Sequence, residues 1–249
     1  NIATLLPKFA KQFYRQRLKS LTLLATTGTE GKTSVTQFIA QALRLLNESC
    51  GLIGTNGIGF LGALAENTHT TPDLLALYRS LAEIEHDFPD QPRKPVALEA
   101  TSHALDQERI AGLSFQSTLF TNLTRDHLDY HKTLRAYGAA KRALFFDYKS
   151  KASIINSDDP FGAELLAELA AKEPERILYP YGERAEGENA LQMSNLTLTA
   201  KGLQFTLNYQ GASYQIESPL YGGFNAYNLL AMVGTLCSLG YAIDEIVAI

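Results

Sequence analysis

The chain has 249 residues, of which 45% are hydrophobic and 19% charged, and its formal net charge is −4 at pH 7. This length is sufficient for a full hydrophobic core, and the lack of a basic excess argues against a nucleic-acid-binding protein. The longest apolar stretch, residues 229–239, is far shorter than the ~18 residues of a membrane-spanning helix, so no membrane span is expected. Cys50 and Cys237 have neither metal-binding nor disulfide spacing, and no signal pattern opens the chain. We therefore expect a cytoplasmic protein.

Residues 1–20 carry five basic side chains and no acidic one. This composition favours a solvated helix or linker over a binding arm, and we interpret the segment as a linker or the end of a preceding domain. From Leu21 the pattern changes to an apolar strand over 21–25, a glycine-containing loop and an amphipathic helix. We assign residues 21–249 to one main domain.

Strand patterns separated by helical patterns recur through most of the chain. After a second strand at 52–55, four glycines between residues 54 and 62 predict a tight hairpin or a mobile loop. Thr71-Pro72-Asp73 predicts the start of a helix, with a capping residue before Pro72 and Pro72 at the first helical position. Further strands are expected at 96–99, 117–121, 152–156 and 176–179. This alternation indicates a mostly parallel sheet covered by helices.

The hydrophobic period changes to two residues between Leu191 and Glu217, with breaks at Lys201-Gly202 and Gln210-Gly211. This pattern predicts an antiparallel β excursion over about residues 190–218. A helix is expected over 225–239, and the chain ends inside another apolar-periodic segment, so we expect it to be part of a longer protein. The predicted fold class is α/β, with a mostly parallel, P-loop-type sheet flanked by helices and a smaller antiparallel β subdomain.

The loop from Thr27 to Thr33, with the sequence Thr-Gly-Thr-Glu-Gly-Lys-Thr, lies between the first strand and the first amphipathic helix. In such a loop, backbone N–H groups and the helix dipole converge on an anion, Lys32 adds a charge at the β/γ-phosphates, and Thr33 is placed to ligate Mg²⁺. The spacing is a shortened variant of the Walker A pattern and favours ATP binding over a structural turn. The sequence has no Asn-Lys-x-Asp motif for guanine. A carboxylate at Glu30 would oppose phosphate charge, so we expect this side chain to point outward.

Polar side chains also follow two later strands. Glu99 ends one of them and would lie at the carboxyl edge of the sheet, where open α/β sheets bind ligands, although a solvated glutamate at a strand end is an equal alternative. Residues 121–131 follow another strand and place polar and metal-capable groups, including His127, on one loop. These two segments are candidates for the chemical part of the site.

Lys141 lies on the apolar stripe of a predicted helix rather than on its solvent face. A lysine whose stem is buried and whose ammonium reaches solvent is the simpler explanation. Full burial would instead lower the pKa of Lys141 and favour the neutral amine, which reacts with CO₂ to form a carbamate. A carbamate is an anionic oxygen ligand suited to Mg²⁺.

Together these segments resemble the Mur ligases, and among them the MurE type, which adds the third, diamino acid residue to UDP-N-acetylmuramoyl-L-Ala-D-Glu. The resemblance runs from about residue 20 to the end, and the matching segments are 27–33, 99–103 with Gln107 and Arg109, 126–131, and 137–141. It implies an ATP-dependent, ADP-forming ligase of peptidoglycan precursor synthesis, in which a substrate carboxylate attacks the γ-phosphate and an amine displaces the acyl phosphate. Another Mur ligase, a folylpolyglutamate synthase or a catalytically incomplete nucleotide-binding module stays as an alternative.

The resemblance also implies roles for individual residues. Catalytic roles fall to Lys32, Glu99, His127 and Lys141. One Mg²⁺ would be held by Thr33, and a second by Glu99, His127 and carbamylated Lys141. The nucleotide would meet Gly28, Thr29, Glu30, Gly31, Lys32, Thr33, Ser34, Asn225 and Asn228, although Asn225 is also typical of a helix N-cap. The UDP-muramoyl dipeptide would meet His69, Thr70, Thr71, Thr101, Gln107 and Arg109.

Three positions depart from the pattern usual in the MurE type: Glu30, His69 and Thr101 stand where Asn, Asn and Ser are common. The uridine-binding and amino-acid-binding domains of the family are not recognised in this sequence, so we expect this part to bind nucleotide without turning over alone. The choice between meso-diaminopimelate and L-lysine as the added amino acid is left open. A monomer without a nucleic-acid partner is expected.

Overall fold

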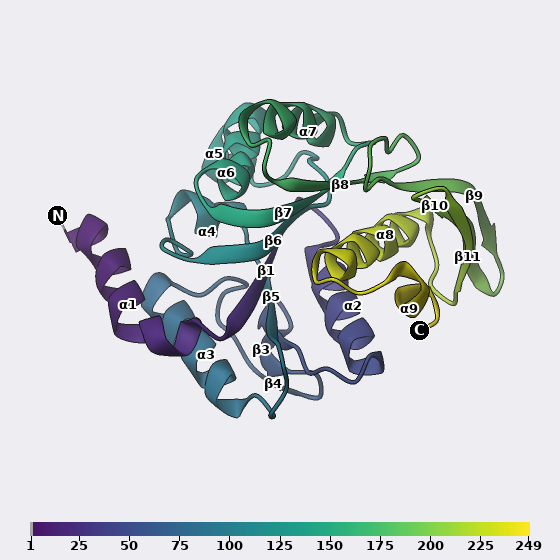
Figure 1. The fold of residues 1–249 in the computed structure, drawn as a ribbon. Helices are drawn as coiled ribbons and strands as arrows, with labels where there is room; N and C mark the ends of the chain where they lie inside the picture. Colours follow the sequence, from purple (N-terminus) through teal and green to yellow (C-terminus); the bar gives the residue numbers. More distant parts are fainter. Residues whose placement is uncertain (1) are drawn as a thin grey trace.

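A computed structural model describes residues 2–249, with side chains from Leu5 onward (Figure 1). The strands in chain order are β1 (Leu21–Thr27), β2 (Gly51–Gly54), β3 (Gly57–Phe60), β4 (Ala63–Ala65), β5 (Lys94–Glu99), β6 (Ser114–Phe120), β7 (Lys149–Asn156), β8 (Ile177–Gly182), β9 (Leu191–Thr199), β10 (Gly202–Tyr209) and β11 (Ala212–Ser218). In this part of the chain they form one eleven-stranded sheet in the order β11-β10-β9-β8-β7-β6-β1-β5-β2-β3-β4.

The centre of the sheet is parallel, as expected from the sequence. β1 lies between β5 and β6, and the parallel pairing continues through β7 and β8 on one side and β2 on the other. Helices on both faces bury these strands, which explains why they read as near-continuous apolar runs. The carboxyl ends of β1, β5 and β6 therefore meet at one edge.

Both ends of the sheet are antiparallel. The glycine-rich segment forms the expected hairpin, in which β2, β3 and β4 pair in succession. β9, β10 and β11 form the antiparallel excursion predicted from the period of two. β9 also pairs in parallel with β8 through Tyr181 and Leu191, so the excursion is an extension of the main sheet rather than a separate sheet.

Helices cover the two faces of the sheet unequally (Figure 1). They are α1 (Ile2–Leu18), α2 (Lys32–Leu45), α3 (Leu74–Asp87), α4 (Ser102–Asp106), α5 (Leu128–His131), α6 (Leu134–Phe146), α7 (Pro160–Lys172), α8 (Gly223–Ser238) and α9 (Ile243–Val247). α2, α8 and α9 pack with Leu24 in one hydrophobic cluster, and α1, α3, α6 and α7 pack with Leu23 and Ala25 in the other. Successive residues of β1 thus point to opposite cores. None of the helices in residues 2–249 combines the length and apolar character that crossing a membrane requires.

Residues 2–20 are mostly helical, and α1 packs against the rest of the fold. Ala10 of α1 is buried, and the Tyr14 ring lies 6.1 Å from that of Tyr78 on α3. The helical interpretation of this segment is confirmed. Its assignment to the end of a preceding domain stays a prediction.

Two expectations about helix starts are wrong. α3 begins at Leu74, because Asp73 is its N-cap and accepts a hydrogen bond from Ala76 N at 3.0 Å. Thr71 instead donates its hydroxyl to Glu99 O at 2.6 Å, which draws it toward β5 rather than to the helix. Asn225 is not an N-cap either, since Gly222 caps α8 and Asn225 lies in its first turn.

Candidate functional site

The predicted phosphate loop lies at the carboxyl edge of β1 and leads into α2. Gly31 caps α2 in a left-handed conformation, with φ 84°. Gly28 lies so close to β6 that a Cβ atom there would be 1.8 Å from Thr121 Oγ1. Only glycine permits this approach without displacing backbone or side chain. Each of the two glycines in the motif is therefore required by the local geometry: Gly31 by its left-handed conformation and Gly28 by its close approach to Thr121.

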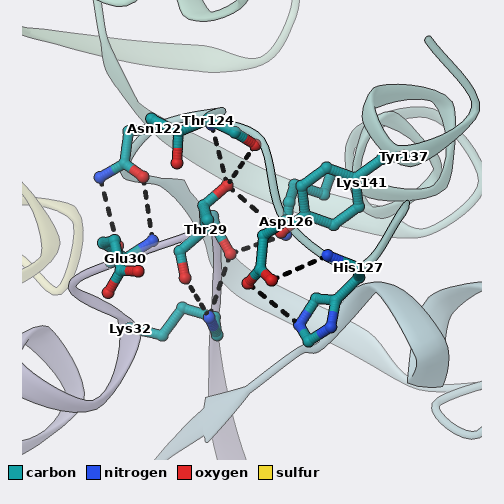
Figure 2. Close-up of polar contacts among 10 residues, drawn as sticks. Thr29, Glu30, Lys32, Asn122, Thr124, Asp126, His127, Tyr137 and Lys141 are labelled. Carbon is teal, nitrogen blue, oxygen red and sulfur yellow. Dashed lines mark hydrogen bonds and ion pairs between the residues drawn. The ribbon is translucent and has the colours of Figure 1, made fainter. Parts of the chain in front are cut away.

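A second segment, directly after β6, holds the loop in place (Figure 2). Asn122 accepts hydrogen bonds from Thr29 N through its backbone oxygen, at 2.8 Å, and from Glu30 N through Oδ1, at 2.9 Å. Thr121 Oγ1 donates to Glu30 O at 2.6 Å. Asn122 was missed from the sequence as a separate site residue, although its position just after a parallel strand was a usable signal.

The Glu30 side chain is exposed. Within residues 2–249 it forms neither a hydrogen bond nor an ion pair, and its ordered contacts are those of its backbone. This exposure leaves the side chain room to point outward, and its direction relative to a bound phosphate stays a prediction. Its effect on nucleotide affinity stays a prediction.

The side-chain nitrogens of two lysines converge on the same backbone carbonyl. Lys32 Nζ donates to Gly28 O at 3.1 Å and to Thr29 O at 2.7 Å, and Lys141 Nζ donates to Gly28 O at 2.6 Å. Lys141 is only 1% exposed, so the alternative of an ammonium that reaches solvent is wrong. Burial lowers the pKa of Lys141 to about 6, and the charge of Lys32 acts in the same direction. Burial also lowers the pKa of Lys32, against the opposing effect of Glu99.

Tyr137 connects Lys141 to the loop (Figure 2). Its ring lies 4.3 Å from Lys141 Nζ, and its hydroxyl donates to Thr29 Oγ1 at 3.2 Å. Thr29 Oγ1 also accepts from Thr124 N at 3.0 Å. From the sequence, Tyr137 was visible only as part of an apolar stripe and of the matched motif, because helical spacing says nothing about where a hydroxyl ends.

Glu99 is buried, with 1% exposure, so the solvated alternative is wrong. Its carboxylate accepts from Thr33 Oγ1 at 2.9 Å, Thr55 N at 2.8 Å and Thr55 Oγ1 at 3.1 Å. Gly54 leaves room for it, since a Cβ there would lie 2.2 Å from Glu99 Oε1. Thr55 was missed from the sequence, and its place directly after β2 is the signal that would have found it.

A cavity of about 450 Å³ opens beside Glu99, and we call it the Glu99 cavity. Its lining includes three of the predicted catalytic residues and five of the six predicted substrate residues, namely Lys32, Glu99 and His127 with His69, Thr70, Thr71, Thr101 and Arg109. Gln107 supports the wall from outside, because its Oε1 accepts from Arg109 Nη2 at 2.7 Å. Thr33 also lines the cavity, but Lys141 does not.

The predicted metal ligands are only partly brought together. Within residues 2–249, no group of three or more His, Cys, Asp or Glu side chains is arranged to hold a metal ion. Glu99 and His127 share the Glu99 cavity, whereas Lys141 points to Gly28 O. The hydroxyl of Thr33 and the carboxylate of Glu99 are hard oxygen donors in contact, a set that fits Mg²⁺.

His127 is the N-cap of α5 and has a left-handed conformation with φ 51°. The backbone N–H of His127 donates to Asp126 Oδ1 at 2.8 Å, and the ring nitrogen Nε2 lies 3.3 Å from Asp126 Oδ2 (Figure 2). The His103 ring lies 4.9 Å from that of His127, and burial lowers the pKa of His103, with the neighbouring His127 and His131 acting in the same direction. The lowered pKa of His103 favours its neutral form, which can accept a proton or bind a cation.

A second cavity, of about 800 Å³, lies on the other side of the loop, and we call it the α8 cavity. It is lined by Glu30, Gly31, Ser34, Thr121, Asn122, Thr124, Asn156, Asp158, Asp159, Pro160, Tyr181, Phe224, Tyr227 and Asn228. Asn228 touches the loop, since a Cβ on Gly31 would be 2.6 Å from Asn228 Oδ1. Asn225 does not line the cavity, but its Oδ1 accepts from Asn228 Nδ2 at 3.1 Å.

Asp158, just after β7, bonds to the segment after β8 and to α8. This residue was missed from the sequence. Its carboxylate accepts from Glu183 N at 2.7 Å, Arg184 N at 2.8 Å and Tyr227 Oη at 2.8 Å. It therefore fixes the first turns of α8 relative to the ends of β7 and β8. The signal for it was the Asn-Ser-Asp-Asp-Pro segment directly after a strand, at residues 156–160.

Comparison with known proteins agrees with this geometry. Residues 26–236 match the family described as Mur ligase middle domain. The chain is 41% identical to the UDP-N-acetylmuramoyl-L-alanyl-D-glutamate–2,6-diaminopimelate ligase of Neisseria meningitidis serogroup A, over 95% of this chain and 47% of that protein. It is 42% identical to the ligase of the same name from Pseudomonas aeruginosa, over 98% of this chain and 48% of that protein. A solved structure of a ligase of this name superposes with a TM-score of 0.84 at 30% identity, covering 96% of this chain and 48% of that one. The chain thus spans about half the length of these relatives.

Proposed function

Because the chain belongs to the Mur ligase family, we propose that it is the nucleotide-binding part of an ATP-dependent, ADP-forming ligase of the MurE type. The relatives are named for joining 2,6-diaminopimelate to UDP-N-acetylmuramoyl-L-alanyl-D-glutamate, and we extend these substrates to this protein. One observation carries the proposal: the Glu99 cavity combines the phosphate-loop residues Lys32 and Thr33 with Arg109, a side chain suited to an anionic substrate.

The charges of the two cavities orient the nucleotide. The β- and γ-phosphates lie at the loop and at the start of α2, where backbone N–H groups and Lys32 meet an anion. The α8 cavity has three acids, Glu30, Asp158 and Asp159, and no lysine or arginine in its lining. Its field disfavours phosphate and favours a neutral group rich in N–H and O–H donors. The adenosine part of ATP therefore occupies the α8 cavity.

In the proposed reaction, the carboxylate of the muramoyl dipeptide attacks the γ-phosphorus of ATP. A carboxyl oxygen–phosphorus bond forms, the bond to the β–γ bridging oxygen breaks, and ADP leaves. The amine of the diamino acid then displaces phosphate from the acyl phosphate to give the amide. Lys32 neutralises charge on the transferred group, and Arg109 holds an anionic part of the dipeptide, so that the residues act mainly by positioning and charge neutralisation.

Mg²⁺ belongs to this proposal on the strength of the oxygen donors present. Thr33 and Glu99 would hold one ion, which would supply positive charge at the β- and γ-phosphates. The low pKa of Lys141, about 6, keeps its amine mostly neutral at pH 7, the form that adds CO₂. A carbamate on Lys141, which points to Gly28 O in this structure, would have to turn toward Glu99 and His127 to hold a second ion with them.

The test is phosphate release by the full-length protein supplied with ATP, Mg²⁺ and the UDP-muramoyl dipeptide. We expect release only when a diamino acid is added, with meso-diaminopimelate favoured over L-lysine. If neither meso-diaminopimelate nor L-lysine led to phosphate release, the proposal would be contradicted. ADP binding without any release would instead support the alternative of a catalytically incomplete nucleotide-binding module, for which the departure at Glu30 is the specific observation.

A further inference from the structure

Phe224 is an apolar side chain left largely uncovered at the edge of the α8 cavity. Its side chain is 68% exposed and belongs to the cavity lining. It lies in the first turn of α8, three residues before Tyr227 and four before Asn228, and both of these also line the cavity. Residues at these spacings share one face of a helix. The Phe224 ring is therefore carried on the same helix face that reaches the loop at Gly31.

The backbone before α8 is shaped to the position of this ring. Gly222 caps the helix with φ 85°, a conformation that disfavours other residues. A Cβ on Gly222 would lie 2.4 Å from Phe224 Cε1, so the ring edge rests directly against the glycine. An alanine at 222 would force the ring to move, whereas glycine lets it stay at the cavity edge.

Among the residues that line the α8 cavity, Phe224 provides an open aromatic face. The polar groups of the α8 cavity are acceptor-rich and suit the N–H and O–H groups of a nucleoside. Tyr227 and Tyr181 have their hydroxyls engaged, with Asp158 at 2.8 Å and with Phe120 O at 3.0 Å, which fixes both rings within the fold. Phe224 has no such tether and presents an open aromatic face, which attracts a flat base because stacking removes apolar surface from water.

We infer that Phe224 is a nucleobase-binding residue that stacks on the base, and that Gly222 holds its ring in place for this contact. The inference rests on the proposed function, because it takes the adenosine part of the nucleotide to lie in the α8 cavity. It separates two sources of affinity: the loop binds the polyphosphate, and Phe224 recognises the base.

The experiment compares ADP with inorganic tripolyphosphate, which has no base, by calorimetry on the full-length protein. Phe224→Leu is expected to raise the Kd of ADP about tenfold, the usual scale of one base–aromatic stack, and to leave the Kd of tripolyphosphate unchanged. Phe224→Tyr keeps the face and should stay within about twofold of the wild-type value for both ligands. Gly222→Ala should weaken ADP binding selectively, as Phe224→Leu does.

Tyr221→Leu is the matched control, because Tyr221 is 65% exposed next to the same turn but is not part of the lining. It is expected to bind both ligands as the wild type does. Wild-type ADP affinity in Phe224→Leu, or equal weakening of ADP and tripolyphosphate, would overturn the role of Phe224 while leaving the proposed function intact. A wild-type protein that binds neither ligand would overturn the proposed function and this inference together.

Discussion

The two cavities beside the phosphate loop differ in charge and in packing. The Glu99 cavity has Lys32 and Arg109 in its lining together with a row of hydroxyls, and its central carboxylate is buried and held by three hydrogen bonds. The α8 cavity has three acids and aromatic rings, with the exposed Phe224 at its edge. In the proposed function, one loop separates a site for anions from a site for a neutral base, and this difference in charge would let a nucleotide bind in one direction only.

The strongest test of this division is Glu99→Gln. The amide keeps an acceptor for Thr33 and Thr55 but removes the negative charge, so turnover is expected to fall about 100- to 1000-fold. ADP affinity should change less than about threefold, because the α8 cavity is untouched. Steady-state phosphate release and calorimetry measure the two quantities.

Glu83→Gln is the control for this change, since Glu83 is an exposed residue of α3 that pairs with Arg79. It should leave both quantities unchanged. If Glu99→Gln retained wild-type turnover, the Glu99 cavity would not be where the chemistry occurs.

The second test uses the buried Lys141, which contacts the loop at Gly28 O. The pKa of Lys141 is about 6 in the folded protein and near 10.5 when unfolded, so unfolding takes up a proton between these pH values. Its charge destabilises the fold fully below pH 6, and this penalty fades as pH rises toward 10.5. Relative to Lys141→Met, the wild-type unfolding free energy should therefore rise by about 2 kcal/mol from pH 6.5 to 8.

Urea denaturation in CO₂-free buffer provides this measurement. Relative to Lys172→Met, which changes an exposed lysine of α7, the wild type should show no such rise, because both proteins keep Lys141. Parallel pH curves for wild type and Lys141→Met would show that the Lys141 amine is not held neutral by burial.

The smallest expected effect concerns Tyr137, which links α6 to the loop. Tyr137→Phe keeps the ring over Lys141 and removes the hydrogen bond to Thr29, a loss of about 1 kcal/mol. The KM for ATP should rise about fivefold while kcat stays nearly constant, as steady-state kinetics would show.

Tyr78→Phe is the matched control, because Tyr78 is also buried and donates to Ala111 O at 2.9 Å, outside both cavities. A reduction of stability without a change in KM is expected there. An unchanged KM in Tyr137→Phe would mean that Thr29 is positioned by Thr124 and the loop backbone alone.

Much of the fold was predictable because its signals are local. The apolar run of β1, the glycines of the loop and the helical face of α2 occur in succession, and the period of two marked β9 to β11. Glu99 ends one parallel strand and Asn122 lies just after another, and the carboxyl ends of such strands meet at one edge whatever the details of packing. The monomeric state, the lack of a nucleic-acid partner and the cytoplasmic location stay predictions.

What the sequence by itself determined is the kind of fold, the phosphate loop and the residue types near it. Only the tertiary structure decided that Thr55 reaches Glu99 across 44 residues, that Tyr137 reaches Thr29 across 108, and that Lys141 points at Gly28 O. It also showed that α3 starts at Leu74 and not at Pro72, because Thr71 bonds to β5 instead of to the helix. The physical reason is that periodicity sets which side of an element a residue occupies, while strand order and side-chain direction set which partner it meets.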